Sequence, residues 1–167
     1  ALRDEWTELL SVSAANTLFL TWEWVATWWQ IYERGRLHVV LVRNSSGQLV
    51  GIAPLHIVRR KVLWTGWSAA VFLGSGGDVT PEYLDFVVRD GWADVVAPAI
   101  LDALLASPRI AEIDLQPLAA HSPTLAVAVA RLKGAGGITT QTPGPRCPYA
   151  VLPRSRAEFL AGRSKNY

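Results

Sequence analysis

The chain has 167 residues, of which half are hydrophobic and 18% are charged, and its formal net charge is +2. This composition is typical of one globular domain with a sizeable core, and it excludes a disordered chain. The small, scattered charge argues against a nucleic-acid-binding protein. The one tight basic run, Arg59-Arg60-Lys61, is interpreted as a solvated strand end.

The single cysteine, Cys147, excludes an intramolecular disulfide. We interpret it as a small buried side chain; the alternative, a nucleophile, would need a general base supplied by the fold. The most apolar helical stretch, residues 92–106, is shorter than the roughly 20 residues that a membrane span needs. The first residues do not read as a signal peptide, so we expect a cytoplasmic protein without a membrane span.

The pattern predicts two helices first, over residues 3–14 and from Trp22 to about Glu33, the second capped by Thr21. The stretch that organises the chain follows them. It consists of predicted strands at residues 37–43 and 48–58, joined by a polar turn at residues 44–47.

Three details of this hairpin can be predicted. The nearly continuous apolar character of residues 37–43 predicts a strand covered on both faces. Gly51 and Pro54 in the second strand predict a bulge or bend. A turn at residues 44–47 places His38 opposite Ala53.

Further elements alternate between strand and helix. Predicted strands are residues 62–67, 70–73, 83–88, 110–115, 138–142 and 147–152, and predicted helices are residues 92–106 and 123–133 and one starting near Ser155. This order predicts an α/β fold, with a mixed sheet and helices on both of its faces.

Several segments carry a family resemblance. Residues 18–29, 35–37 and 47–55 resemble the N-terminal half of the CelD/BioF-like acetyltransferases, and so do residues 73–78 and 83–85. The resemblance implies the GNAT fold of acyl-CoA N-acyltransferases, with a mostly antiparallel central sheet. It also implies a bacterial protein that is linked to cellulose or exopolysaccharide synthesis and related to the FemAB peptidyltransferases. Both groups carry two acyltransferase-like halves in tandem.

The resemblance implies a domain division as well. Residues 1–153 would be a GNAT-like N-terminal lobe whose first strand is missing, and residues 154–167 the start of a second, truncated lobe. Residues 163–167 match the start of the basic, Ser-Lys-rich helix that opens the second half, which makes Lys165 a candidate substrate-binding residue. The expected main partner is the missing C-terminal lobe, which would carry the acyl-donor site.

The cofactor prediction depends on the loop that would hold a pyrophosphate. Backbone amides at a helix N-terminus bind such a group. In the resembled family this loop has the pattern Arg/Gln-x-x-Gly-x-Gly/Ala and lies between the fourth strand and the following helix. The segment at that place here, residues 88–92, has one glycine, and Asp90 places a negative charge where a phosphate would sit. We therefore expect no cofactor in this fragment, and acetyl-CoA or another acyl-CoA for the full-length protein. Residues 131–136 fit the family spacing but follow a helix, which is typical of a glycine-rich C-cap.

Four of the eight tryptophans fall in the second predicted helix. Helical spacing places Trp22 and Trp29 on one face and Trp24 and Trp28 on roughly the other. One pair can fill the core, and the other needs a second cover, either the missing lobe or a ligand such as a sugar. Trp24 is therefore a candidate substrate-binding residue, with core or interdomain packing as the alternative. Any tryptophan left exposed is expected to mark a partner surface.

Tyr83 and Asp85 share one face of a predicted strand beside a glycine-rich loop. The resemblance implies that this strand borders the substrate cleft, where a polar pair could bind an amine or hydroxyl acceptor; the alternative is a surface-facing pair. The three histidines show no metal-ligand spacing, and we can name no catalytic residue from the sequence.

Three hypotheses remain open. The first is the N-terminal lobe of a two-lobed acyltransferase, which contributes acceptor binding and lobe packing and has little activity alone. The second is a non-catalytic module with a degenerate GNAT fold that binds a carbohydrate, such as a polysaccharide, or a protein. The third, a standalone acetyltransferase, conflicts with the poor phosphate loop.

Overall fold

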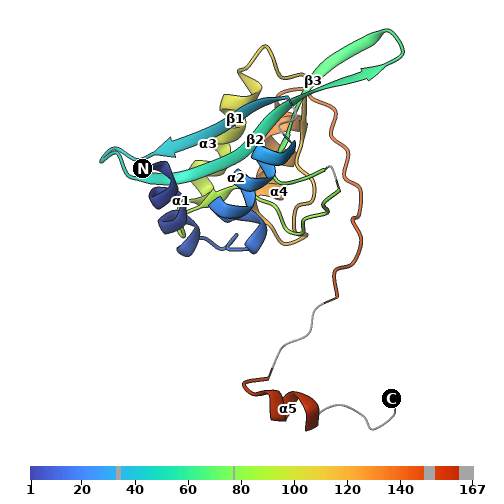
Figure 1. Cartoon of the computed structure of the whole chain (residues 1–167). Helices are drawn as coiled ribbons and strands as arrows, with labels where there is room; N and C mark the ends of the chain where they lie inside the picture. Colours follow the sequence, from blue (N-terminus) through green and yellow to red (C-terminus); the bar gives the residue numbers. More distant parts are fainter. Residues whose placement is uncertain (33–34, 77, 149–152, 162–167) are drawn as a thin grey trace.

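The computed structural model describes residues 1–32, 35–76, 78–148 and 153–161 (Figure 1). In chain order its elements are α1 (Leu2–Ser11), the 3-10 helix η1 (Leu18–Leu20), α2 (Trp22–Tyr32), β1 (Arg36–Arg43), β2 (Leu49–Val62), β3 (Thr65–Phe72), β4 (Val87–Val88), α3 (Ala93–Leu105), β5 (Glu112–Asp114), α4 (Pro123–Gly134) and α5 (Arg156–Ala161).

The strands of the described part form one five-stranded sheet in the order β1-β2-β3-β5, with β4 paired to β2. Strand β2 runs antiparallel to β1, β3 and β4, and only the β3–β5 pair is parallel. The predicted α/β class with a mixed, mostly antiparallel sheet is confirmed, whereas the GNAT fold itself stays a prediction.

Helices cover both faces of the sheet, as two residues of β2 show. The His56 ring contacts the rings of Trp28 and Trp29 on α2, with ring centroids 5.2 and 6.0 Å apart. A side chain at Gly51 would meet Val96 on α3. These two positions are an odd number of residues apart, so they lie on opposite faces of the strand. Helix α4 packs on α3 in the outer layer.

The centre of the core is β2, where nine consecutive residues from Leu49 to Ile57 are buried. By contrast, β1 is an edge strand whose residues are half-buried or exposed. Val39 and Val40 point to opposite faces of the strand, and both are half-buried against the core. Both faces of β1 are therefore partly covered, less completely than those of β2.

Pro54 and Gly51 lie where β2 changes from one neighbouring strand to another. Along one edge of β2, residues 55–62 pair with β3 and residues 51–52 pair with β4, so Pro54 lies where the partner changes. Its carbonyl accepts a hydrogen bond from Leu73 N at 2.8 Å, and its missing N–H falls in the gap between partners. The predicted irregularity is a register shift next to Gly51, while pairing through Pro54 is regular.

This shift also changes the register that the sequence suggested. His38 lies opposite Leu55, not Ala53. The turn is longer than predicted because Asn44 N bonds to Gln48 O at 3.0 Å, which places Gln48 in the turn. The longer turn moves the pairing by one residue, and the register shift after Val42 moves it by one more. His38 is therefore displaced by two positions, from Ala53 to Leu55.

Several predicted strands differ in extent. Residues 65–72 form one continuous strand, and only Val87–Val88 of the predicted strand 83–88 pairs. No strand forms at residues 138–142 or 147–148, which are mostly exposed; residues 149–152 lie outside the described part. Ser155 accepts a hydrogen bond from Glu158 N at 3.2 Å at the start of α5, where a capping box is predicted. None of the helices in the described part is long and apolar enough to cross a membrane.

Candidate functional site

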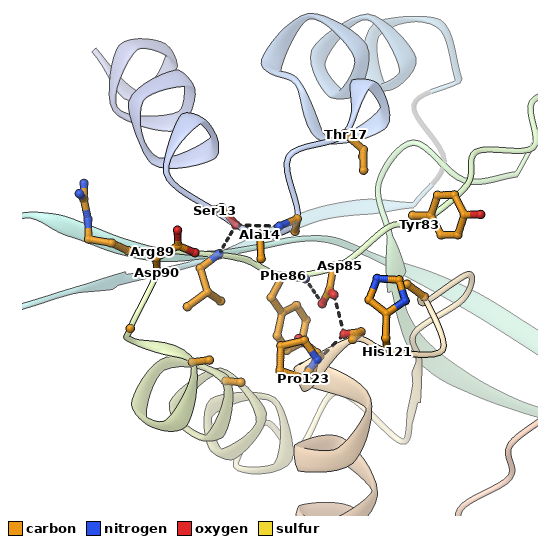
Figure 2. Close-up of a pocket in the computed structure, with 18 residues that line it drawn as sticks. Ser13, Ala14, Thr17, Tyr83, Asp85, Phe86, Arg89, Asp90, His121 and Pro123 are labelled. Carbon is orange, nitrogen blue, oxygen red and sulfur yellow. Dashed lines mark hydrogen bonds between the residues drawn. The ribbon is translucent and has the colours of Figure 1, made fainter. Parts of the chain in front are cut away.

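A pocket of about 290 Å³ opens where four segments meet (Figure 2). The segments are the chain after α1, residues 83–91 around β4, the first turns of α3, and the N-terminus of α4. Most of its wall is small and apolar; the alanines that line it are Ala14, Ala15, Ala93, Ala97 and Ala119. Small side chains leave the space open, and a few polar groups then give the pocket its chemistry.

Asp85 is the buried carboxylate of this pocket, with 8% of its surface exposed. Its Oδ1 accepts a hydrogen bond from Phe86 N at 2.7 Å, and its Oδ2 accepts one from Ser122 Oγ at 2.5 Å. Burial raises the pKa of Asp85 above its usual value, and hydrogen bonds from Ser122, Thr124 and Phe86 oppose that shift. A carboxylate offers about four acceptor positions, so capacity for a ligand donor remains.

The N-terminus of α4 positions the donors to this carboxylate. Ser122 is the N-cap and Pro123 follows at the first helical position, as the sequence predicts. The Ser122 hydroxyl accepts from Thr124 N at 3.1 Å and donates to Asp85. The helix start is therefore tied to the segment before β4, and the negative carboxylate lies at the positive end of the helix dipole.

Among the other polar side chains that line the pocket, Thr17, His121 and Tyr83 differ in how available they are to a ligand. Thr17 Oγ1 is buried and has no hydrogen-bond partner among the described residues. His121 is exposed at the rim, and its charge contributes to lowering the pKa of Asp85. Tyr83 is 39% exposed and adopts φ = 55°, a backbone conformation rare for a bulky residue. Residues 83–86 do not pair as the predicted strand would, but Tyr83 and Asp85 still line one pocket.

The wall beside α1 is fixed by Ser13. Its hydroxyl accepts hydrogen bonds from Val88 N and Ala15 N, each at 3.2 Å, and its backbone forms a bridge with Arg89. The chain after α1 thereby extends the sheet next to β4. Arg89 pairs with Glu8 at 3.0 Å, so its charge is directed to α1.

The segment that matches the expected phosphate loop, residues 88–92, does connect a strand to a helix. It links β4 to α3, and Arg89, Asp90 and Gly91 line the pocket. Asp90 N is occupied by a bond to Val12 O at 3.0 Å, and its side chain is exposed. Residues 131–136 form the C-cap of α4, with Ala135 N bonded to Arg131 O at 3.0 Å, as predicted.

Trp24 lies outside the pocket wall. Its ring packs edge-on against Phe19, with centroids 4.9 Å apart, and against Gly74, where an added Cβ would lie 2.9 Å from Trp24 Nε1. Neither predicted tryptophan pair fills the core as a pair. Trp28 is the buried member, while Trp22, Trp24 and Trp29 are half-buried.

The remaining candidates contribute little to a site. Lys165 lies outside the described residues. Cys147 is half-buried in the extended segment after α4, and its Sγ lies 3.8 Å from Pro145 O. Across the described chain, no group of three or more His, Cys, Asp or Glu side chains could hold a metal ion.

Sequence reasoning missed Ser13, Thr17 and Ser122 as pocket residues. The N-cap signal at Ser122 is readable in the sequence, but its partner Asp85 lies 37 positions earlier, and no local pattern links the two. The same limit applies to Ser13, whose bond to Val88 N spans 75 positions.

Comparisons of the chain with protein-family models, with curated proteins and with solved structures found no match. The resemblance to the CelD/BioF-like acetyltransferases therefore rests on the quoted segments alone.

Proposed function

We propose that the pocket around Asp85 binds the acceptor of an acyl-transfer reaction, a small amine or alcohol. In this proposal the chain is the N-terminal lobe of a CelD/BioF-like acyltransferase linked to cellulose or exopolysaccharide synthesis. The lobe supplies acceptor binding and packing surface, and a second lobe supplies the acyl-CoA site. Activity of this chain alone is expected to be low.

The observation that carries the proposal is one buried carboxylate in a pocket with small apolar walls. An amine cation is attracted to a carboxylate, and the attraction is stronger where water is excluded. The unpartnered hydroxyl of Thr17 can accept a hydrogen bond from the ligand or donate one to it. Because burial raises its pKa, Asp85 is also closer to accepting a proton near neutral pH than an exposed aspartate is.

The donor side of the reaction has less support in this chain. Asp90 and the bond that occupies its N–H give the loop before α3 little capacity for a diphosphate. We therefore expect that acetyl-CoA does not bind to this chain.

Titration calorimetry tests the proposal with D-glucosamine, D-glucose and acetyl-CoA as separate probes. We expect glucosamine to bind with a dissociation constant on the order of 1 mM, since a drug-sized ligand gains about 0.3 kcal/mol per atom. The variant Asp85→Asn should raise the dissociation constant for glucosamine at least tenfold. The matched control is Asp102→Asn, which removes an exposed carboxylate on α3 outside the pocket.

The other outcomes assign the chain differently. A micromolar dissociation constant for acetyl-CoA would support the standalone acetyltransferase. Binding of cello-oligosaccharides that is unaffected by Asp85→Asn would support the non-catalytic module. If neither amines nor alcohols bind, the acceptor role is contradicted.

A further inference from the structure

The hairpin of β2 and β3 projects beyond the body of the molecule (Figure 1). Its strands pair as far as Val62 and Thr65, which leaves Leu63 and Trp64 as a two-residue turn at the tip. The tip is strongly apolar and strongly exposed, with 59% of Val62, 82% of Leu63 and 96% of Trp64 accessible. Single exposed apolar residues are common, but three in succession on a protrusion indicate an interaction surface.

The backbone at the tip gives a second observation. Leu63 adopts φ = 52°, in the left-handed region where Gly, Asn or Asp is the usual turn residue. A leucine at this position costs stability and makes little contact with the rest of the chain. The apolar side chain therefore has no structural reason to be there.

The charges behind the tip are arranged by strand alternation. Arg59 and Lys61 share one face of β2, are exposed, and form no ion pair within the described residues. Arg60 points to the other face, where it pairs with Glu112 and Asp114 of β5. These ion pairs hold Arg60 against β5. The charges of Arg59 and Lys61, on the other face of β2, are not paired with any described acidic residue.

We propose that this hairpin tip inserts into the interface of a lipid bilayer that contains anionic phospholipids. Trp64, Leu63 and Val62 would enter the boundary between headgroups and acyl chains, where tryptophan is the preferred aromatic residue. Lys61 pairs with Gly66 directly behind the Val62–Thr65 pair that closes the turn, and Arg59 lies two residues further back. Both cations therefore stay behind the apolar tip, where they can lie at the level of the phosphates. This sequence of an apolar tip followed by cations matches a bilayer surface better than an apolar protein pocket.

Flotation of the whole chain with vesicles tests this proposal. We expect the protein to partition onto vesicles of phosphatidylcholine and phosphatidylglycerol in a 7:3 ratio, and at least tenfold less onto pure phosphatidylcholine. The double variant L63G/W64S should reduce partitioning at least tenfold. The variant R59A/K61A should also reduce it about tenfold and flatten its dependence on salt.

Matched controls separate the tip from general effects. Ile138→Ser removes a fully exposed apolar side chain outside the hairpin, and K133A/R146A removes two exposed cations elsewhere. Both should partition like the parent. The proposal is overturned if the parent does not bind anionic vesicles or if L63G/W64S binds equally well. Sedimentation velocity distinguishes the alternative. If the parent does not bind vesicles but self-associates, and L63G/W64S abolishes this self-association, the hairpin tip forms a protein contact instead.

Discussion

At the scale of single residues, Asp85 sets the properties of the pocket. A buried carboxylate is costly unless hydrogen bonds compensate for the lost water. Phe86 N and Ser122 Oγ provide two such bonds. The pKa of Asp85 is nevertheless raised, because the loss of water outweighs these bonds.

The raised pKa predicts how stability depends on pH. Between the ordinary value of 3.8 and the higher folded value, the folded state binds more protons at Asp85 than the unfolded state does. The contribution of Asp85 to the free energy of unfolding therefore falls as pH rises through this window. Urea unfolding of the parent and of Asp85→Asn should show this fall only in the parent. Parallel pH profiles would contradict it.

Gly51 is the residue where the sheet and α3 come closest. An added Cβ would lie 2.1 Å from Val96 Cγ1 and 3.3 Å from Val42 Cβ, and all of these atoms lie in or beside the core. We expect Gly51→Ala to lower the free energy of unfolding by about 1–3 kcal/mol through overpacking. Gly144→Ala is the control, because nothing lies within 4 Å of its added Cβ. Equal stabilities of the two variants would contradict this packing.

At the scale of elements, local signals predicted the helices well. Thr21 and Ser122 begin α2 and α4 as predicted, and their hydroxyls accept from Trp24 N at 3.3 Å and Thr124 N at 3.1 Å. The strands were predicted less well because their extent depends on distant partners. Of the predicted strand 83–88 only Val87–Val88 pairs, because the same edge of β2 is paired with β3 from Leu55 onward. Strand β1 is less buried than its apolar run suggests, because it lies at the edge of the sheet.

The β2–β3 turn gives a prediction at this scale. Leu63→Asn should raise the free energy of unfolding by about 0.5–1 kcal/mol, because asparagine tolerates the left-handed region better than leucine does. Trp64→Asn is the matched control. Trp64 is just as exposed but has an ordinary φ, so its replacement should be nearly neutral. Chemical denaturation measures both, and a loss of stability in Leu63→Asn would contradict the turn geometry.

At the scale of the whole molecule, the fold class could be predicted, but the pocket as an assembly could not. The order of helices and strands indicates a mixed sheet with two covered faces, as observed. The pocket needs four segments brought together over long sequence separations, and no periodicity encodes that. Two of its residues, Tyr83 and Asp85, were predicted because they share a face of a predicted strand that, in the resembled fold, borders the substrate cleft.

The exposed segment after α4 predicts where the chain is cut first. Residues 141–146 are exposed and form no helix or strand, whereas the arginines and lysine near the β2–β3 tip lie in paired strands. Limited trypsin digestion should therefore cleave after Arg146 before it cleaves after Arg59 or Lys61. Mass spectrometry of the early fragments identifies the site. First cleavage in the hairpin would contradict this order.

The central claim is that a small acceptor, an amine or an alcohol, binds beside Asp85; D-glucosamine carries both groups. Amide chemical shifts of the ¹⁵N-labelled protein, followed during titration with D-glucosamine, test it most directly. The account predicts saturable shifts confined to the pocket, led by Thr17, Asp85, Phe86 and Ser122, and absent in Asp85→Asn. Shifts that are absent, or that lie mainly on residues away from the pocket, would contradict it.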